Sequence, residues 1–130
     1  MDNTTVFGTV DSGSNPDGTT KYEYLKALTE DEGKMKVITI CGSLKFENDI
    51  KYHTERLELE GNCVLGIIFL TKDKSKYNEE QFRLLGEAHH KKIELSDAIF
   101  VVNKNNYIGE SVRKEIEFAK KLKKEILYLE

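Results

Sequence analysis

The sequence predicts a doubly wound α/β domain over residues 35–130, with a four-stranded, mainly parallel sheet between two layers of helices. Short β-branched apolar runs alternate with segments of helical periodicity, which indicates right-handed crossovers and a parallel sheet. The runs are continuously apolar rather than alternating, as is typical of strands that are buried on both faces. We expect the strand order 2-1-3-4, as in flavodoxin-like and Rossmann-like folds.

The expected strands are residues 36–41, 63–70, 98–103 and 126–129. Between the first two, Phe46, Ile50, His53 and Leu57 recur at helical spacing. Two further helices are expected over residues 79–92 and 111–124, the first with Phe82, Leu85 and His89 on one face and the second with Val112, Ile116, Ala119 and Leu122 as its buried stripe.

Residues 1–34 differ from the rest of the chain in composition and charge. They contain seven acids and three lysines, whereas the remainder contains 16 acids and 17 bases. Their first 20 residues are mostly Gly, Ser, Thr, Asn and Asp, a composition that seldom forms a core. We therefore expect a polar, acidic N-terminal arm or extension followed by one domain.

The composition excludes several classes of partner and suggests a compartment. A net charge of −3 provides no basic field for a nucleic acid polymer, and no apolar run is long enough to span a membrane. Cys41 ends one expected strand and Cys63 begins its neighbour, so the two thiols lie at opposite edges of the sheet and cannot form a disulfide. With no secretion signal, we expect a cytoplasmic protein with reduced thiols.

Two loops should form a ligand site at the topological switch point between the first and third strands. The loop of residues 42–45 precedes a helix, where backbone N–H groups bind anions. Ser43 adds a hydroxyl and Lys45 a charge beside Gly42, so a phosphate is one expected ligand of this loop. The alternative is a tight turn with a helix-capping serine. The second loop supplies further candidate contacts, namely Asn103, Tyr107, Gly109, Glu110 and Ser111.

Glu115 lies one helical turn beyond Ser111, where the helix dipole favours its ionised form. It is either a functional carboxylate that faces the sheet edge or an ordinary solvated glutamate. His89 lies on an apolar helix face, where a histidine is usually packed in the core. The two cysteines are separated, so the sequence contains no ligand set with metal spacing, and we expect neither a metal nor another cofactor.

Several short motifs resemble those of the nucleoside 2-deoxyribosyltransferase-like superfamily. They are Ile40–Phe46 (ICGSLKF), His89–Ile93 (HHKKI), Ser96–Ile99 (SDAI) and Tyr107–Ser111 (YIGES) running into Glu115–Ala119 (EIEFA). The resemblance covers residues 35–130, and the last motif is the most specific. It implies that Glu115 is the nucleophile on the sugar C1′ and that Gly42, Ser43 and Lys45 bind a 5′-phosphate, with lysine in place of the family's arginine.

The chain also departs from the family pattern. Gly109 stands where family enzymes usually carry an aspartate, with Glu110 beside it, and His89 or His90 stands where they carry another. The general acid is therefore not assigned. The resemblance further implies a homodimer or higher homo-oligomer, because a neighbouring subunit often completes the sites of the family.

The leading hypothesis is an enzyme that breaks the N-glycosidic bond of a nucleoside or nucleoside 5′-monophosphate, as a deoxyribosyltransferase or an N-glycoside hydrolase. Glu115 would attack C1′, Ser43, Lys45 and Ser111 would hold the phosphate, and His89 and Tyr107 would line the pocket. Two alternatives stay open: a nucleotide-binding module without turnover, and a scaffold whose N-terminal arm mediates assembly.

Overall fold

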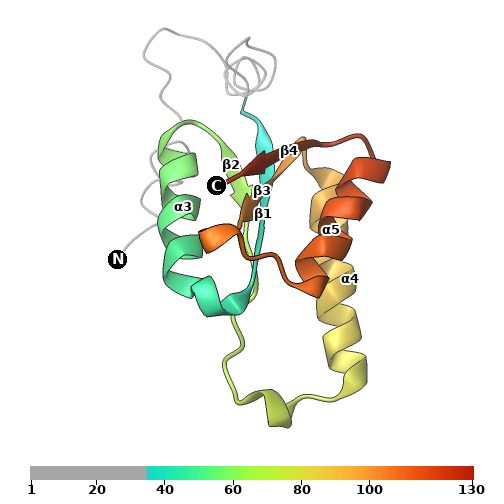
Figure 1. The fold of residues 1–130 in the computed structure, drawn as a ribbon. Coiled ribbons are helices and arrows are strands. Elements are labelled where there is room, and N and C mark those ends of the chain that lie inside the picture. The colour runs from blue at the N-terminus through green and yellow to red at the C-terminus, as the bar shows by residue number, and fades with distance from the viewer. Residues whose placement is uncertain (1–34) are drawn as a thin grey trace, which may run out of the picture. The chain divides into compact units, whose positions relative to one another are not determined.

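The computed structural model describes residues 35–130, and the expected N-terminal arm lies outside them. The domain contains a sheet of four parallel strands in the order β2-β1-β3-β4 (Figure 1). The strands are β1 (Val37–Gly42), β2 (Cys63–Leu65), β3 (Ala98–Val102) and β4 (Glu125–Tyr128). The doubly wound α/β fold and its strand order are therefore confirmed.

Three α-helices connect these strands and cover both faces of the sheet. Helix α3 (Glu47–Leu59) packs on one face, whereas α4 (Glu79–Leu95) and α5 (Glu110–Lys121) pack on the other (Figure 1). Three short 3-10 helices complete the connections: η1 (Leu44–Phe46), η2 (Lys74–Lys76) and η3 (Lys104–Asn106).

A separate apolar core fills the space on each side of the sheet. The core beneath α3 consists of Ile38, Ile40, Ile50, Leu57, Ala98, Phe100 and Val102. The core beneath α4 and α5 consists of Cys41, Ile93, Ile99, Val101, Val112, Ile116 and Ala119. Residues of β1 and β3 alternate between the two cores because successive side chains of a strand point to opposite faces. The buried stripe expected for α5 is thus confirmed for Val112, Ile116 and Ala119.

The second strand is much shorter than the apolar run that predicts it. We expected a strand over residues 63–70, but β2 ends at Leu65. Gly66 follows at once, and glycine weakens a strand because it has no side chain to pack. Ile67 and Phe69 still pack against the core beneath α3, whereas Ile68 is 55% exposed. This segment thus leaves the edge of the sheet and becomes available to line a site.

The other element boundaries differ from expectation by a few residues. Helix α4 continues to Leu95, and α5 begins at Glu110 and ends at Lys121. Lys123 has a φ of 60°, a left-handed conformation that no helix interior tolerates, so the chain must turn there from α5 into β4.

Both cysteines are free: Cys41 lies near the end of β1, and Cys63 begins the neighbouring strand β2. Cys41 is paired with Val101, whereas Cys63 is paired with Val37 at the start of β1. The expectation that they do not form a disulfide is confirmed. Among residues 35–130, no helix combines the length and the apolar character needed to cross a membrane.

Candidate functional site

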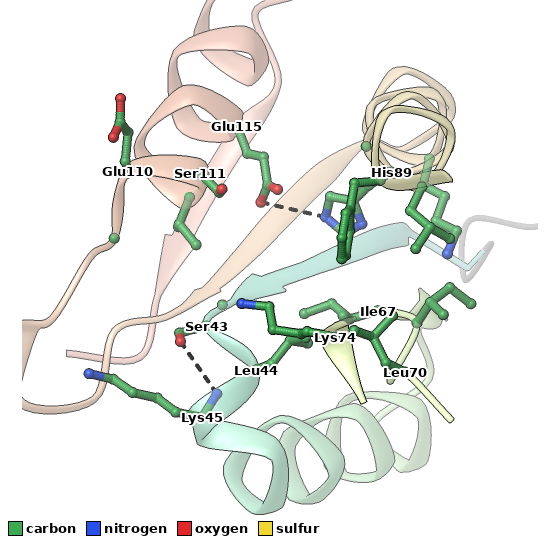
Figure 2. Close-up of a pocket in the computed structure, with 18 of the residues that line it drawn as sticks. Ser43, Leu44, Lys45, Ile67, Leu70, Lys74, His89, Glu110, Ser111 and Glu115 are labelled. Atoms are coloured by element: carbon green, nitrogen blue, oxygen red, sulfur yellow. Dashed lines mark hydrogen bonds and ion pairs between the residues drawn. The ribbon is translucent and has the colours of Figure 1, made fainter. Parts of the chain in front are cut away.

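A cavity of about 640 Å³ lies at the carboxyl edge of the sheet, where the loops after β1 and β3 converge. Its volume is in the usual range for small-molecule sites. Parts of β1, α4 and α5, together with the segment after β2, supply its walls (Figure 2). It is lined by Gly42, Ser43, Leu44, Lys45, Ile67, Ile68, Leu70, Lys74, Phe82, Leu85, Gly86, His89, Lys92, Tyr107, Gly109, Glu110, Ser111, Val112 and Glu115.

Every residue that the sequence predicts for the site lines this cavity except Asn103. Asn103 is 5% exposed, and its Oδ1 accepts a hydrogen bond of 2.8 Å from the backbone N–H of Glu130. The prediction that Asn103 contacts substrate is therefore not supported by its position. Its side chain instead ties the end of β3 to the C-terminal residue, because a buried amide must find partners within the protein.

The loop after β1 presents a hydroxyl and an ammonium group at one end of the cavity (Figure 2). Ser43 Oγ accepts a hydrogen bond of 3.3 Å from Lys45 N and so caps η1. Its hydroxyl hydrogen can still be donated to a ligand. Lys45 Nζ lies 3.6 Å from the centroid of the Tyr107 ring, a cation–π contact that joins the two converging loops.

The start of α5 forms the neighbouring wall. Its N-cap residue is Gly109, which supplies no side chain to cap the first backbone N–H groups of the helix. These donors and the positive end of the helix dipole favour an anion. Ser111 lies beside them, whereas the Glu110 side chain is 84% exposed and points away from the cavity (Figure 2). Glu110 therefore lines the cavity without offering its carboxylate to the interior.

Glu115 occupies the inner wall, one turn further along α5. Its side chain is 17% exposed, so it is not the solvated helix glutamate of the alternative interpretation. Its Oε1 lies 3.5 Å from His89 Nε2, which comes from α4 (Figure 2). The same nitrogen lies 3.6 Å from Cys41 Sγ on β1. Three elements thus bring a carboxylate, an imidazole and a thiol to one point.

Burial perturbs the titration of all three groups. It lowers the pKa of His89 to about 4, with the charges of Lys92 and His90 acting in the same direction. Burial also raises the pKa of Glu115, although a hydrogen bond from the Cys41 thiol partly opposes this change. The pKa of Cys41 is raised by burial and by the nearby Glu115. His89 is therefore neutral at neutral pH, and Cys41 is a thiol rather than a thiolate.

The expectation of no metal site rests on the spacing of possible ligands along the chain and on the separation of Cys41 from Cys63. The fold instead places one ligand atom from each of Cys41, His89 and Glu115 within 4.8 Å of the others. Linear spacing does not show such a group, because its members come from a strand and two different helices.

The apolar half of the cavity is not evident from the sequence motifs. Ile67, Ile68 and Leu70 belong to the apolar run that predicts one strand, and only Gly66 signals that the run is interrupted. From α4, Phe82, Leu85 and His89 face the same space, as their shared helix face predicts. Lys74, from η2, adds a second ammonium group to the lining that no motif indicated.

A scan against protein-family models and a search of curated proteins both returned no match to this chain.

Proposed function

We propose that the domain cleaves the N-glycosidic bond of a nucleoside or nucleoside 5′-monophosphate, with Glu115 as the nucleophile. The observation that carries this proposal is the Glu115 carboxylate, 17% exposed, in the wall of a cavity that has anion-binding groups at one end and apolar side chains at the other. The resemblance of residues 107–119 to the nucleoside 2-deoxyribosyltransferase-like superfamily supports the same role.

The two ends of the cavity match the two ends of a nucleotide. Ser43 and Lys45 lie with the uncapped start of α5 at the polar end, where a 5′-phosphate would accept their hydrogen bonds (Figure 2). Ile67 and Leu70 lie at the other end and offer an apolar surface for a base (Figure 2). The sugar would then lie between the ends, beside Glu115.

The proposed reaction begins with attack of a Glu115 oxygen on C1′. The new C–O bond forms as the C1′–N bond breaks, and the base departs with that electron pair and takes up a proton. Water or a second base then attacks C1′ and releases the carboxylate, as in retaining glycosidases. Because burial raises the pKa of Glu115, its ionised form is a stronger base than an exposed glutamate. His89, neutral and 3.5 Å away, positions the carboxylate.

Incubation with a panel of nucleosides and nucleoside 5′-monophosphates, with chromatographic detection of free base, tests this function. The wild type should release base from at least one member of the panel, and E115Q should be slower by several orders of magnitude, since an amide is a poor nucleophile. E110Q is the matched control, because Glu110 lies on the same helix and lines the same cavity with its side chain in solvent. Tight binding without base release would favour the nucleotide-binding module instead.

We also propose that the protein forms a homodimer or a higher homo-oligomer. Two large apolar side chains of the cavity lining are substantially exposed: Phe82 by 39% and Ile68 by 55%. A neighbouring subunit that covered them would also close the cavity. Light scattering at micromolar concentration should give at least twice the mass of the chain, and a monomer under these conditions would contradict the proposal.

A further inference from the structure

Cys41, His89 and Glu115 form a cluster that the proposed reaction uses only in part. Cys41 has no role in glycosyl transfer, yet its sulfur contacts the imidazole that faces Glu115. The three residues come from β1, α4 and α5, which pack together around the core that contains Cys41 and Ile116. Their relative positions are therefore held by the fold and not by one flexible loop.

The two separations from His89 Nε2 within this cluster match those of a zinc ligand set. The usual Zn–S, Zn–N and Zn–O bond lengths in a tetrahedron place sulfur and nitrogen about 3.6 Å apart and nitrogen and oxygen about 3.4 Å apart. The structure has 3.6 Å between Cys41 Sγ and His89 Nε2, and 3.5 Å between His89 Nε2 and Glu115 Oε1. The three ligand atoms all lie within 4.8 Å of one another.

We propose that Cys41, His89 and Glu115 bind one Zn²⁺ ion at the inner wall of the cavity, with its fourth coordination position open to the cavity. His89 and Glu115 line the cavity, so a water molecule or a ligand in it can reach that position. Three protein ligands and one exchangeable ligand are the usual composition of a zinc site that is not purely structural.

A nucleophilic cysteine is the other function that a thiol beside an imidazole suggests, and the geometry does not favour it. In a cysteine–histidine pair, a third group normally orients the imidazole through its second nitrogen. Here the thiol and the carboxylate meet the same nitrogen, Nε2 of His89. Cys41 is also 0% exposed, and burial raises the pKa of its thiol, so it is a poor nucleophile. Convergence of three donor atoms on one point suits a metal ion instead.

The donor set selects among metals by its chemistry. A thiolate and an imidazole favour Zn²⁺ over the hard cations Mg²⁺ and Ca²⁺, which prefer oxygen ligands. His89 is neutral and can coordinate without losing a proton, since burial lowers its pKa to about 4. The Cys41 thiol must release its proton to solvent when the Zn–S bond forms, and the thiolate and the Glu115 carboxylate then balance the charge of the ion.

This site goes beyond the proposed function and does not depend on it, because the ion can be detected without a substrate. The two are linked through Glu115, whose carboxylate is a weaker nucleophile while it coordinates zinc. If Glu115 is the nucleophile, Zn²⁺ should therefore inhibit base release, and a chelator should restore it.

Metal binding by the full chain, without an affinity tag and after treatment with a chelator, tests the proposal. Zn²⁺ titrated in competition with a chromogenic chelator should bind at one ion per chain, and Mg²⁺ should not compete. Co²⁺ in place of Zn²⁺ should give the near-ultraviolet charge-transfer absorption of a thiolate–cobalt bond. C41S should remove this absorption, whereas the matched control C63S should retain it, since Cys63 lies on β2 and pairs with Val37 at the start of β1.

H89Q and E115Q provide the second pair of variants, in case C41S does not fold. Each should weaken Zn²⁺ binding at least about tenfold while the far-ultraviolet circular dichroism stays that of the wild type. Absence of stoichiometric Zn²⁺ binding to the wild type would overturn the proposal. It would also be overturned by a Co²⁺ absorption that C63S abolishes, or by zinc affinities unchanged in H89Q and E115Q.

Discussion

Lys45 provides the most direct test of the phosphate end of the cavity. The change is Lys45→Met, which keeps much of the aliphatic chain and removes the charge. A charged hydrogen bond to a phosphate contributes about 1.5–3 kcal/mol. Before it can form, Lys45 Nζ must leave the Tyr107 ring, whose centroid is 3.6 Å away, and an exposed cation–π contact of this kind is worth about 0.5–1 kcal/mol.

The difference between these two energies sets the expected effect. K45M should weaken the binding of a nucleoside 5′-monophosphate by about 1–2 kcal/mol, or roughly 5- to 30-fold in affinity. The affinity for the matching nucleoside should change by no more than about twofold. Isothermal titration calorimetry measures both affinities, and the E115Q background prevents turnover during the titration. K104M is the matched control, because Lys104 bonds to Asp49 and does not line the cavity. An equal loss for both ligands, or no loss for the monophosphate, would refute the phosphate assignment.

Three further predictions concern stability. Because burial lowers the pKa of His89 from 6.5 to about 4, the folded state disfavours the imidazolium and loses stability as the pH falls through this range. In denaturant titrations of chelator-treated protein, the free energy of unfolding of H89Q should therefore fall by about 2 kcal/mol less than that of the wild type between pH 7 and pH 5. An equal fall in both proteins would contradict this. N103A should lower the free energy of unfolding by about 1–3 kcal/mol through its lost hydrogen bond to Glu130 and leave ligand affinity unchanged; a weaker affinity at full stability would restore Asn103 to the site. A chain that begins at Met35 should fold and keep its ligand affinity, because residues 36–130 form a compact unit with two apolar cores, and failure to fold on circular dichroism would show that residues 1–34 are required.

The sequence predicts the sheet well because its strands carry a strong local signal. Ile38, Ile40, Ile99 and Val101 belong to continuous apolar runs, and such runs are buried whichever helix covers them. The order of strands follows from the alternation of strands with helices. The run over residues 63–70 misleads because an apolar sequence fits both an edge strand and an apolar cavity wall, and Gly66 is the one residue that separates the two.

The part of the candidate site on the switch-point loops is the most directly predictable from the sequence. Ser43, Lys45 and Ser111 follow from topology, since parallel strands bring their carboxyl ends to one edge. The prediction for Asn103 is not supported because the sequence does not show that the backbone N–H of Glu130 donates a hydrogen bond to its side-chain oxygen. Cys41, His89 and Glu115 come close together because two helices pack against one strand. The periodicity of each helix alone does not determine how the three side chains lie relative to one another.

The identity of the nucleophile is the central claim, and a covalent intermediate tests it most directly. The wild type is mixed with a substrate found in the base-release panel, quenched in acid within the first turnover and digested, and the peptides are analysed by mass spectrometry. A peptide that contains Glu115 should gain the mass of the sugar or sugar phosphate, and the corresponding peptide of E115Q should not. A sugar adduct on Glu110, or base release by E115Q at the rate of the wild type, would contradict the account.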